Sequence, residues 1–240
     1  GTFNDITPVR STVSLGADPV NTTGGAGSGV VTVTTQAAHG AITGDFVTLA
    51  SLTATDGITT GQLNKEHEIT SVPSTTTFTI DTGGSASSGS TAGGGSSGTA
   101  AFQINVGLNT TVLGSGWGAG TWGRFTWGSA AGSLSGQTLR LFSVDNFGED
   151  LIFNISDGSI FYWDATNGTS TRAVALTSLT GASDVPTVAR KVLVSDVDRH
   201  VIIFGCNPIG SAVLDPLLIR FGSQESVTDF TPTATNTADA

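Results

Sequence analysis

The chain has 240 residues, of which only 12% are charged, and its formal net charge is −10. Affinity for phosphate backbones comes from Lys and Arg side chains that displace counterions, so this charge argues against a protein that grips nucleic acid. The single cysteine excludes an intrachain disulfide, and no apolar run reaches the ~18 residues that a membrane-spanning helix needs.

Residues 1–29 are predicted to be an extended entry segment that is continuous with a larger β-domain. Pro8 and Pro19 each push the preceding residue towards extended backbone geometry. The sequence NTTGGAGSG at 21–29 favours a flexible turn. Because the sequence contains no methionine, we expect it to be part of a longer subunit.

Residues 30–81 are predicted to form a small β-barrel or sandwich module. The run VVTVTT at 30–35 alternates apolar and polar residues, which is the period of a half-buried strand. Similar runs predict further strands at 46–49, 68–72 and 77–80. Short strands at this spacing are typical of a small barrel or sandwich.

Residues 82–99 have the low-complexity sequence TGGSASSGSTAGGGSSGT. Such a composition cannot bury enough apolar surface to fold by itself. We expect a Gly/Ser-rich loop or linker carried on a β-scaffold, because strand-like alternation resumes directly after it.

Residues 100–240 predict a β-propeller-like domain of paired antiparallel strands. The pair Asp157-Gly158 is a hairpin signal between two apolar runs. About two blade-like units can be recognised, fewer than a closed propeller needs, so we expect the domain to be incomplete. The predicted fold class is all-β, with a small β-module followed by propeller-like sheets. Strand-forming runs lie at 139–147, 149–156, 159–164, 191–207 and 215–223.

His39 and Asp45 are the first candidate functional residues along the chain. They share the sequence HGAITGD, but no other His or Cys lies at ligand spacing, so a metal site is not predicted. We expect both side chains to hold a turn by hydrogen bonds to the backbone.

Two acidic clusters have the residue types of a catalytic acid/base pair or a calcium site. The sequence SDVDRH at 195–200 lacks the glycine and the later Glu of a calcium-binding loop. The three acids of DNFGED at 145–150 lie within one turn, which is a poor arrangement for flanking a glycosidic bond. Turns are the simpler interpretation for the members of both clusters, Asp145, Glu149, Asp150, Asp196, Asp198, Arg199 and His200.

Cys206 and His200 cannot form a nucleophile pair, because along one strand they would lie roughly 20 Å apart at ~3.3 Å per residue. Cys206 is expected to be a buried apolar residue. The run SDGSIFYWD at 156–164 does not match the spacing of the sialidase Asp-box. No catalytic residue, cofactor site or metal site is therefore predicted.

Trp117, Trp122 and Trp127 recur at five-residue spacing in GWGAGTWGRFTWG. Such a row can be a platform for sugar rings, but packing in a core or between subunits is the simpler interpretation.

Residues 38–80 resemble a small β-module of tailed-phage virion proteins. The resemblance rests on AHG at 38–40, TGDFV at 43–47 and TTTFTI at 75–80. That module is in turn similar to the first catalytic-cysteine half-domain of ubiquitin-activating enzymes, which implies a fold and no ubiquitin chemistry. The segments DNFGEDL and DRHVIIFG also resemble parts of large phage structural proteins, several of them propeller-like. The resemblance implies no catalytic residues.

The sequence thus predicts a non-enzymatic structural component of a bacteriophage virion. We expect it in the tail, as copies in a ring, hub or nozzle that contacts other tail or portal-proximal proteins. DNA would pass transiently, because an acidic wall does not hold it. One alternative is a tail-fibre or surface module that binds host glycans through the three tryptophans. Another is a glycan-degrading enzyme that uses Asp145, Glu149 or Asp196.

Overall fold

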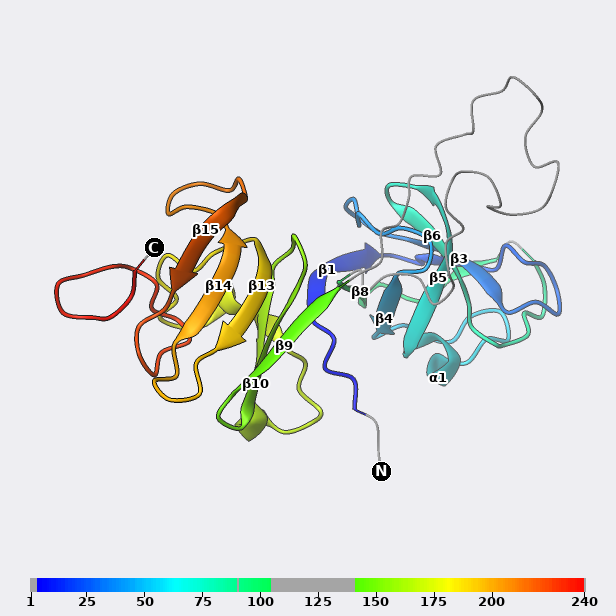
Figure 1. Ribbon diagram of the computed structural model, residues 1–240. Coiled ribbons are helices and arrows are strands. Elements are labelled where there is room, and N and C mark those ends of the chain that lie inside the picture. Colours follow the sequence, from blue (N-terminus) through cyan, green and yellow to red (C-terminus); the bar gives the residue numbers. More distant parts are fainter. Residues whose placement is uncertain (1–3, 90, 105–140, 240) are drawn as a thin grey trace, which may run out of the picture. The chain divides into compact units, whose positions relative to one another are not determined.

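The computed structural model describes residues 4–89, 91–104 and 141–239 (Figure 1). The chain forms two compact units. One consists of Arg10–Leu139 and is called the inserted unit here; the other combines Gly1–Val9 with Arg140–Ala240 and is called the host unit. The described strands lie in three sheets, which confirms the predicted all-β class.

In the described part of the inserted unit, eight strands form one sheet. Its spatial order is β1-β8-β4-β5-β6-β3-β2-β7. Strands from the predicted entry segment, module and Gly/Ser stretch therefore all belong to one sheet. The strands are β1 (Val9–Gly16), β2 (Val20–Asn21), β3 (Val30–Thr34), β4 (Phe46–Ala50), β5 (Glu66–Ser74), β6 (Thr77–Asp81), β7 (Ala92–Gly93) and β8 (Gly98–Gln103).

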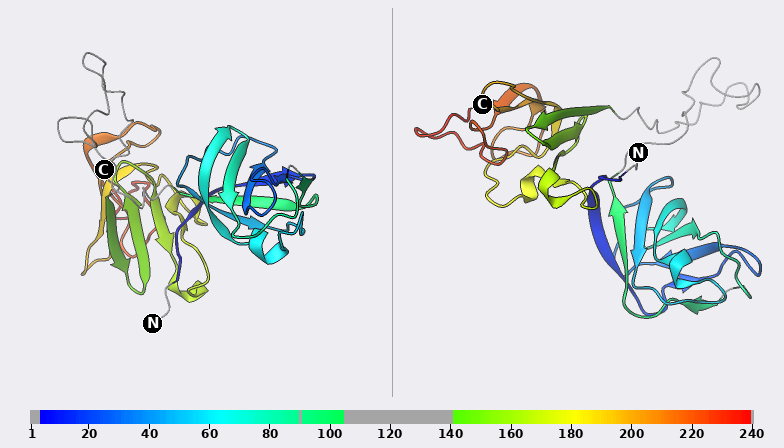
Figure 2. Two further views of the ribbon diagram at one scale, coloured as in Figure 1. Left: turned by 90° about the vertical axis from the view of Figure 1, so that its right-hand side faces the viewer. Right: turned by 90° about the horizontal axis from the view of Figure 1, so that it is seen from below.

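Alternation along these strands explains how the sheet encloses a core. In β3, β4 and β6 every second residue is buried, as the period of two predicts. Residues of β1 and β2, near opposite ends of the strand order, join the same core, so the sheet curves around it (Figure 2). The fully buried members include Val20, Val31, Val33, Val47, Ile69, Phe78, Ile80 and Phe102.

A short helix, α1 (Thr60–Leu63), precedes β5 and was not expected from the sequence. Thr59 and Gln62 form a capping box: each side chain accepts a hydrogen bond from the other residue's backbone N–H. The spacing T-x-x-Q was present in the sequence and could have predicted this helix start.

The Gly/Ser-rich stretch is tied to the rest of the inserted unit at Asp56. The Asp56 carboxylate accepts hydrogen bonds from the Thr22 hydroxyl (2.7 Å) and from the backbone N–H (3.0 Å) and hydroxyl (2.8 Å) of Ser88. Ala86 in this stretch is buried. Although its composition is that of a linker, this stretch packs as a loop at these points.

The host unit contains two antiparallel meanders. The first has the order β12-β11-β10-β9 and the second β13-β14-β15 (Figure 1). The hairpin between β10 and β11 turns at Asp157, whose φ is +58°. The elements are β9 (Phe142–Phe147), β10 (Asp150–Ile155), β11 (Ile160–Trp163), the 3-10 helix η1 (Ala165–Asn167), β12 (Val174–Ala175), the 3-10 helix η2 (Leu176–Ser178), β13 (Ala189–Val194), β14 (Val201–Cys206) and β15 (Asp215–Phe221).

The two meanders bury one face each in a common core. Ile152 and Ile160 of the first meander join Val192, Val201 and Ile203 of the second in one apolar cluster. Each sheet thus has one face in the core. The opposite face is the one that other molecules could contact, so its residues bear on function.

Candidate interaction surface

The face of the β13–β15 sheet that points away from the core is apolar. Strand register places Lys191, Phe204 and Ile219 in one row across the three strands. The neighbouring row consists of Leu193, Ile202 and Phe221. Because side chains alternate along a strand, both rows face away from the core row that contains Val192 and Ile203. We call this surface the outer face.

Exposure is greatest on β15. Leu217 is 89% exposed and Ile219 is 47% exposed. The end of this strand is covered, because Phe221 exchanges backbone hydrogen bonds with Asp239 (3.0 and 3.2 Å). Apolar residues on an edge strand are a template for contact with another sheet, and proteins ordinarily cover or charge them.

A shallow groove of about 390 Å³ runs beside β13. Three apolar residues of its wall, Leu141, Phe142 and Val144, are 60%, 45% and 59% exposed. Arg190 and Lys191 supply two cationic side chains, and Ser143 and Ser156 complete the lining. Since Lys191 also belongs to the outer face, the groove borders that surface.

The turn between β13 and β14 lies at the other end of the same strand. The N–H of Ser195 donates to the carbonyl of His200 (2.9 Å), and the N–H of Arg199 donates to the carbonyl of Ser195 (3.0 Å). Arg199 adopts a φ of +48°. Val197 stands at the tip, 88% exposed. The predicted turn at 195–200 is confirmed.

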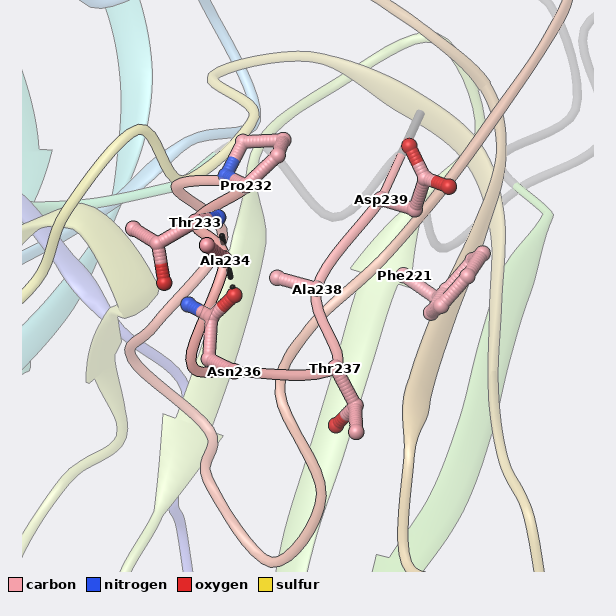
Figure 3. Close-up of a pocket in the computed structure, with 8 residues that line it drawn as sticks. All are labelled: Phe221, Pro232, Thr233, Ala234, Asn236, Thr237, Ala238 and Asp239. Carbon is pink, nitrogen blue, oxygen red and sulfur yellow. Dashed lines mark hydrogen bonds between the residues drawn. The ribbon is translucent and has the colours of Figure 1, made fainter.

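A second depression, of about 470 Å³, lies in the C-terminal loops of the host unit (Figure 3). Its polar lining is engaged within the loop: the N–H of Thr233 donates to the Asn236 side chain (3.0 Å), which itself donates to the Thr231 carbonyl (2.8 Å). The Thr237 hydroxyl accepts from the N–H of Gln224 (2.8 Å). These contacts stabilise the loop and leave little polar chemistry directed at a ligand.

Asp145 and Asp150, two of the acids weighed as catalytic, hold backbone in place. Asp145 accepts from the N–H of Val194 (2.8 Å) and of Asn146 (2.9 Å). Asp150 accepts from the Tyr162 hydroxyl and from the N–H of Ala165 (2.9 Å). Burial, together with this carboxylate, raises the pKa of Tyr162 well above its ordinary value, so the phenol stays a neutral donor.

His39 and Asp45 hold their turn as predicted. The N–H of Ala41 donates to Nδ1 of His39 (3.0 Å), and the N–H of Ile42 donates to the Asp45 carboxylate (3.0 Å). His39 also stacks on Phe102 with ring centroids 5.3 Å apart, a contact that the sequence did not indicate.

The remaining predicted residues range from exposed, as at Glu149, to buried, and some lie outside the described residues. Cys206 is buried, and burial raises the pKa of its thiol, which disfavours a reactive thiolate. His200 Nδ1 lies 2.8 Å from the carbonyl of Gly222. Trp117, Trp122 and Trp127 lie outside the described residues.

The described residues contain no group of three or more His, Cys, Asp or Glu that could hold a metal ion. No helix among them has the length and apolarity required to cross a membrane.

Comparisons with known proteins identify no family for this chain. No family model and no curated protein match the chain, so the resemblance of residues 38–80 to the ubiquitin-activating half-domain finds no support. Among solved structures, the chain is similar to one described as "Phage phi92 endosialidase", with a TM-score of 0.31 and 12% identity. That similarity covers 90% of this chain and 30% of the other, so the chain spans less than a third of that protein. A likeness this low carries no argument about function.

Proposed function

We propose that this chain is a structural component of a bacteriophage tail, assembled through β-sheet contacts into a ring, hub or nozzle. The phage assignment is based on the segments DNFGEDL and DRHVIIFG, which resemble segments of phage structural proteins. The assembly part comes from the structure.

The observation that carries the assembly role is the outer face of the β13–β15 sheet. Its two rows contain five apolar residues and one lysine, and Leu217 beside them is almost fully exposed. A sheet face of this kind is stabilised when it is covered, and the opposite face of the same sheet is already covered by the first meander. Assembly is the role that such a surface serves.

Two features of the chain suit a mechanical role near DNA. The net charge of −10 keeps the surface from holding a phosphate backbone, so DNA can pass without binding. The acids at Asp145 and Asp150 stabilise backbone rather than meet in a cleft. The proposal therefore requires no catalytic step.

Cryo-electron microscopy of the intact particle tests this proposal directly. Six or twelve copies around the tail axis, with the outer face against a neighbour, are the expected result. Three copies at a distal tip would overturn it in favour of a host-glycan-binding module, and the tryptophans at 117, 122 and 127 would then become the positions to substitute.

In solution, Leu217→Lys is expected to weaken assembly, because it places a charge in the apolar contact. Sedimentation velocity of the variant and the parent chain measures the change. Val213→Lys, at a 75% exposed position outside the two rows, is the matched control and should leave assembly as it was. Equal weakening by both substitutions would mean that added charge, not the outer face, controls association.

A further inference from the structure

The groove beside β13 is a basic site on an acidic chain. Arg190 and Lys191 are the one pair of adjacent cationic residues in the sequence, whose net charge is −10. Arg190 Nε lies 3.0 Å from the Asp157 carboxylate, but the two side chains are 52% and 60% exposed. Such a surface pair contributes little and leaves the other guanidinium nitrogens available.

The opposite wall of the groove is apolar. Phe142 and Val144 lie on one face of β9 and Leu141 precedes them; all three line the groove together with Arg190 and Lys191. All three keep about half of their surface in contact with solvent. The groove therefore suits a ligand that combines an apolar side chain with negative charge on both sides of it.

The turn between β13 and β14 has this composition. Val197 is 88% exposed and lies between Asp196 and Asp198, which are both exposed. Two backbone hydrogen bonds close the turn at Ser195, so the three side chains are presented at a defined tip. The tip therefore offers two carboxylates and one apolar side chain, which complement the two cations and the apolar residues of the groove.

We propose that the Asp196–Val197–Asp198 tip of one copy inserts into the groove of the next copy. The inference rests on the proposed function, since it adds to the outer face a second contact between copies. Val197 would lie against Phe142 and Val144, while Asp196 and Asp198 would face Arg190 and Lys191. The occupant is a second copy because the charges are complementary and the chain itself carries the matching tip.

The geometry of β13 makes this contact a head-to-tail one. Arg190 and Lys191 lie at the start of the strand and the tip follows its end, roughly 20 Å away at ~3.3 Å per residue. The two patches differ, so after one contact the first copy keeps a free groove and the second copy keeps a free tip. Heterologous contacts of this type close into rings or extend as filaments, whereas a twofold dimer would have to make the same contact twice at once.

A charge-swap experiment on the whole chain tests the proposal. The groove variant is Arg190→Glu with Lys191→Glu, and the tip variant is Asp196→Lys with Asp198→Lys. Each alone places like charges together and should weaken self-association by at least about tenfold. A one-to-one mixture restores opposite charges at every contact, so mixed oligomers of both masses should form in native mass spectrometry.

The outcomes separate this inference from the proposed function. Self-association of either variant at the strength of the parent chain would overturn the tip-in-groove contact and leave assembly through another surface intact. Failure of the mixture to form oligomers, with both variants folded by circular dichroism, would also overturn it. A parent chain that stays monomeric in solution overturns the inference as well, while the position in the particle tests the function independently.

Val197 supplies a test that leaves the charges unchanged. Val197→Ser removes the apolar contact and should weaken association, while Val197→Ile retains it and should not. Equal association of both variants would show that charge alone holds the copies and would overturn insertion of the side chain.

Discussion

At the scale of single residues, buried polar side chains connect segments that are far apart in the sequence. Arg220 in β15 is 1% exposed, and its guanidinium donates to three backbone carbonyls, those of Asp184 (2.6 Å), Phe230 (3.2 Å) and Asn207 (3.3 Å). The planar guanidinium holds its donors in a fixed fork, and here that fork reaches carbonyls of three separate segments. Arg220 therefore fixes the loops beneath β15, and with them the position of the outer face.

Arg220→Leu is expected to destabilise the host unit by at least about 2 kcal/mol, because each carbonyl left without a donor costs about 1–3 kcal/mol. Urea unfolding followed by circular dichroism measures this loss. Arg190→Ala is the matched control: it removes an exposed ion pair and should change stability by less than about 1 kcal/mol. Similar losses for both variants would mean that the three carbonyl contacts contribute nothing specific.

His67 makes the stability of the inserted unit dependent on pH. The side chain is buried, and Nε2 donates to the Leu63 carbonyl (3.0 Å). Burial lowers the pKa of His67 from its usual 6.5, and Lys65 lowers it further, while the Leu63 carbonyl and Asp81 oppose the shift. Because the unfolded chain then binds more protons than the folded one, the contribution is complete above pH 6.5 and is lost as the pH falls below it.

Hydrogen exchange of the β4 and β5 amides measures this effect. The free energy of opening should fall on acidification below about pH 6.5 with a slope of up to about 1.4 kcal/mol per pH unit. His67→Gln keeps a donor for Leu63 without titrating and should remove that slope. A slope that survives in the variant would assign the pH dependence to other groups.

At the scale of elements, the two edge strands of the β13–β15 sheet differ in how they are covered. The edge of β13 that does not pair with β14 is covered by side chains of β9. The Ser143 hydroxyl donates to the carbonyl of Val192 (2.6 Å) and accepts from its N–H (3.3 Å), and the Asp145 carboxylate accepts from the N–H of Val194. β15 has apolar, exposed side chains at Leu217 and Ile219 instead. The two edge strands therefore differ: side chains of β9 satisfy backbone groups of β13, whereas β15 presents apolar side chains to solvent.

Asp145→Ala is expected to destabilise the host unit by about 1–3 kcal/mol, since it leaves the N–H of Val194 without its acceptor. Amide exchange at Val192 and Val194 should accelerate, and NMR or mass spectrometry can follow it. Asp145→Asn retains an acceptor oxygen and should restore most of the protection. Unchanged exchange in Asp145→Ala would show that β9 does not protect this edge.

At the scale of the whole molecule, one unit interrupts the sequence of the other. The host unit takes residues from both ends of the chain, and the N–H of Ala173 donates to the carbonyl of Ile6 (3.0 Å) while Arg172 pairs with Asp5 (2.8 Å). Within the inserted unit, the first strand β1 and the last strand β8 are neighbours in the sheet. Each unit has a separate apolar core.

Two separate cores predict two unfolding transitions in calorimetry of the full chain, because each core can be lost by itself. Arg220→Leu should lower the transition of the host unit and leave the other in place. Residues 10–104 expressed alone should melt at the temperature of the unaffected transition. One cooperative transition that responds as a whole to Arg220→Leu would contradict independent units.

Local sequence patterns were sufficient where burial alternates along a strand. The runs at 30–35, 46–49 and 77–80 became β3, β4 and β6 because a period of two places every second residue in a core, whatever the partner strand is. The turns at Asp157 and at 195–200 were also predicted, since short polar residues and glycine favour turn geometry locally.

By itself, then, the sequence determined the all-β class, most strands and the turn that holds His39 and Asp45. Only the tertiary structure decided which face of each strand meets a core, because that depends on register between distant segments. It placed Arg190 and Lys191 beside Phe142 and Val144, some fifty residues earlier in the sequence, and it left Leu217 in solvent. The sequence of a strand has the same apolar residues whether their side chains pack in the core or are exposed for contact with a partner. An interaction surface can therefore be recognised only after the core residues have been assigned.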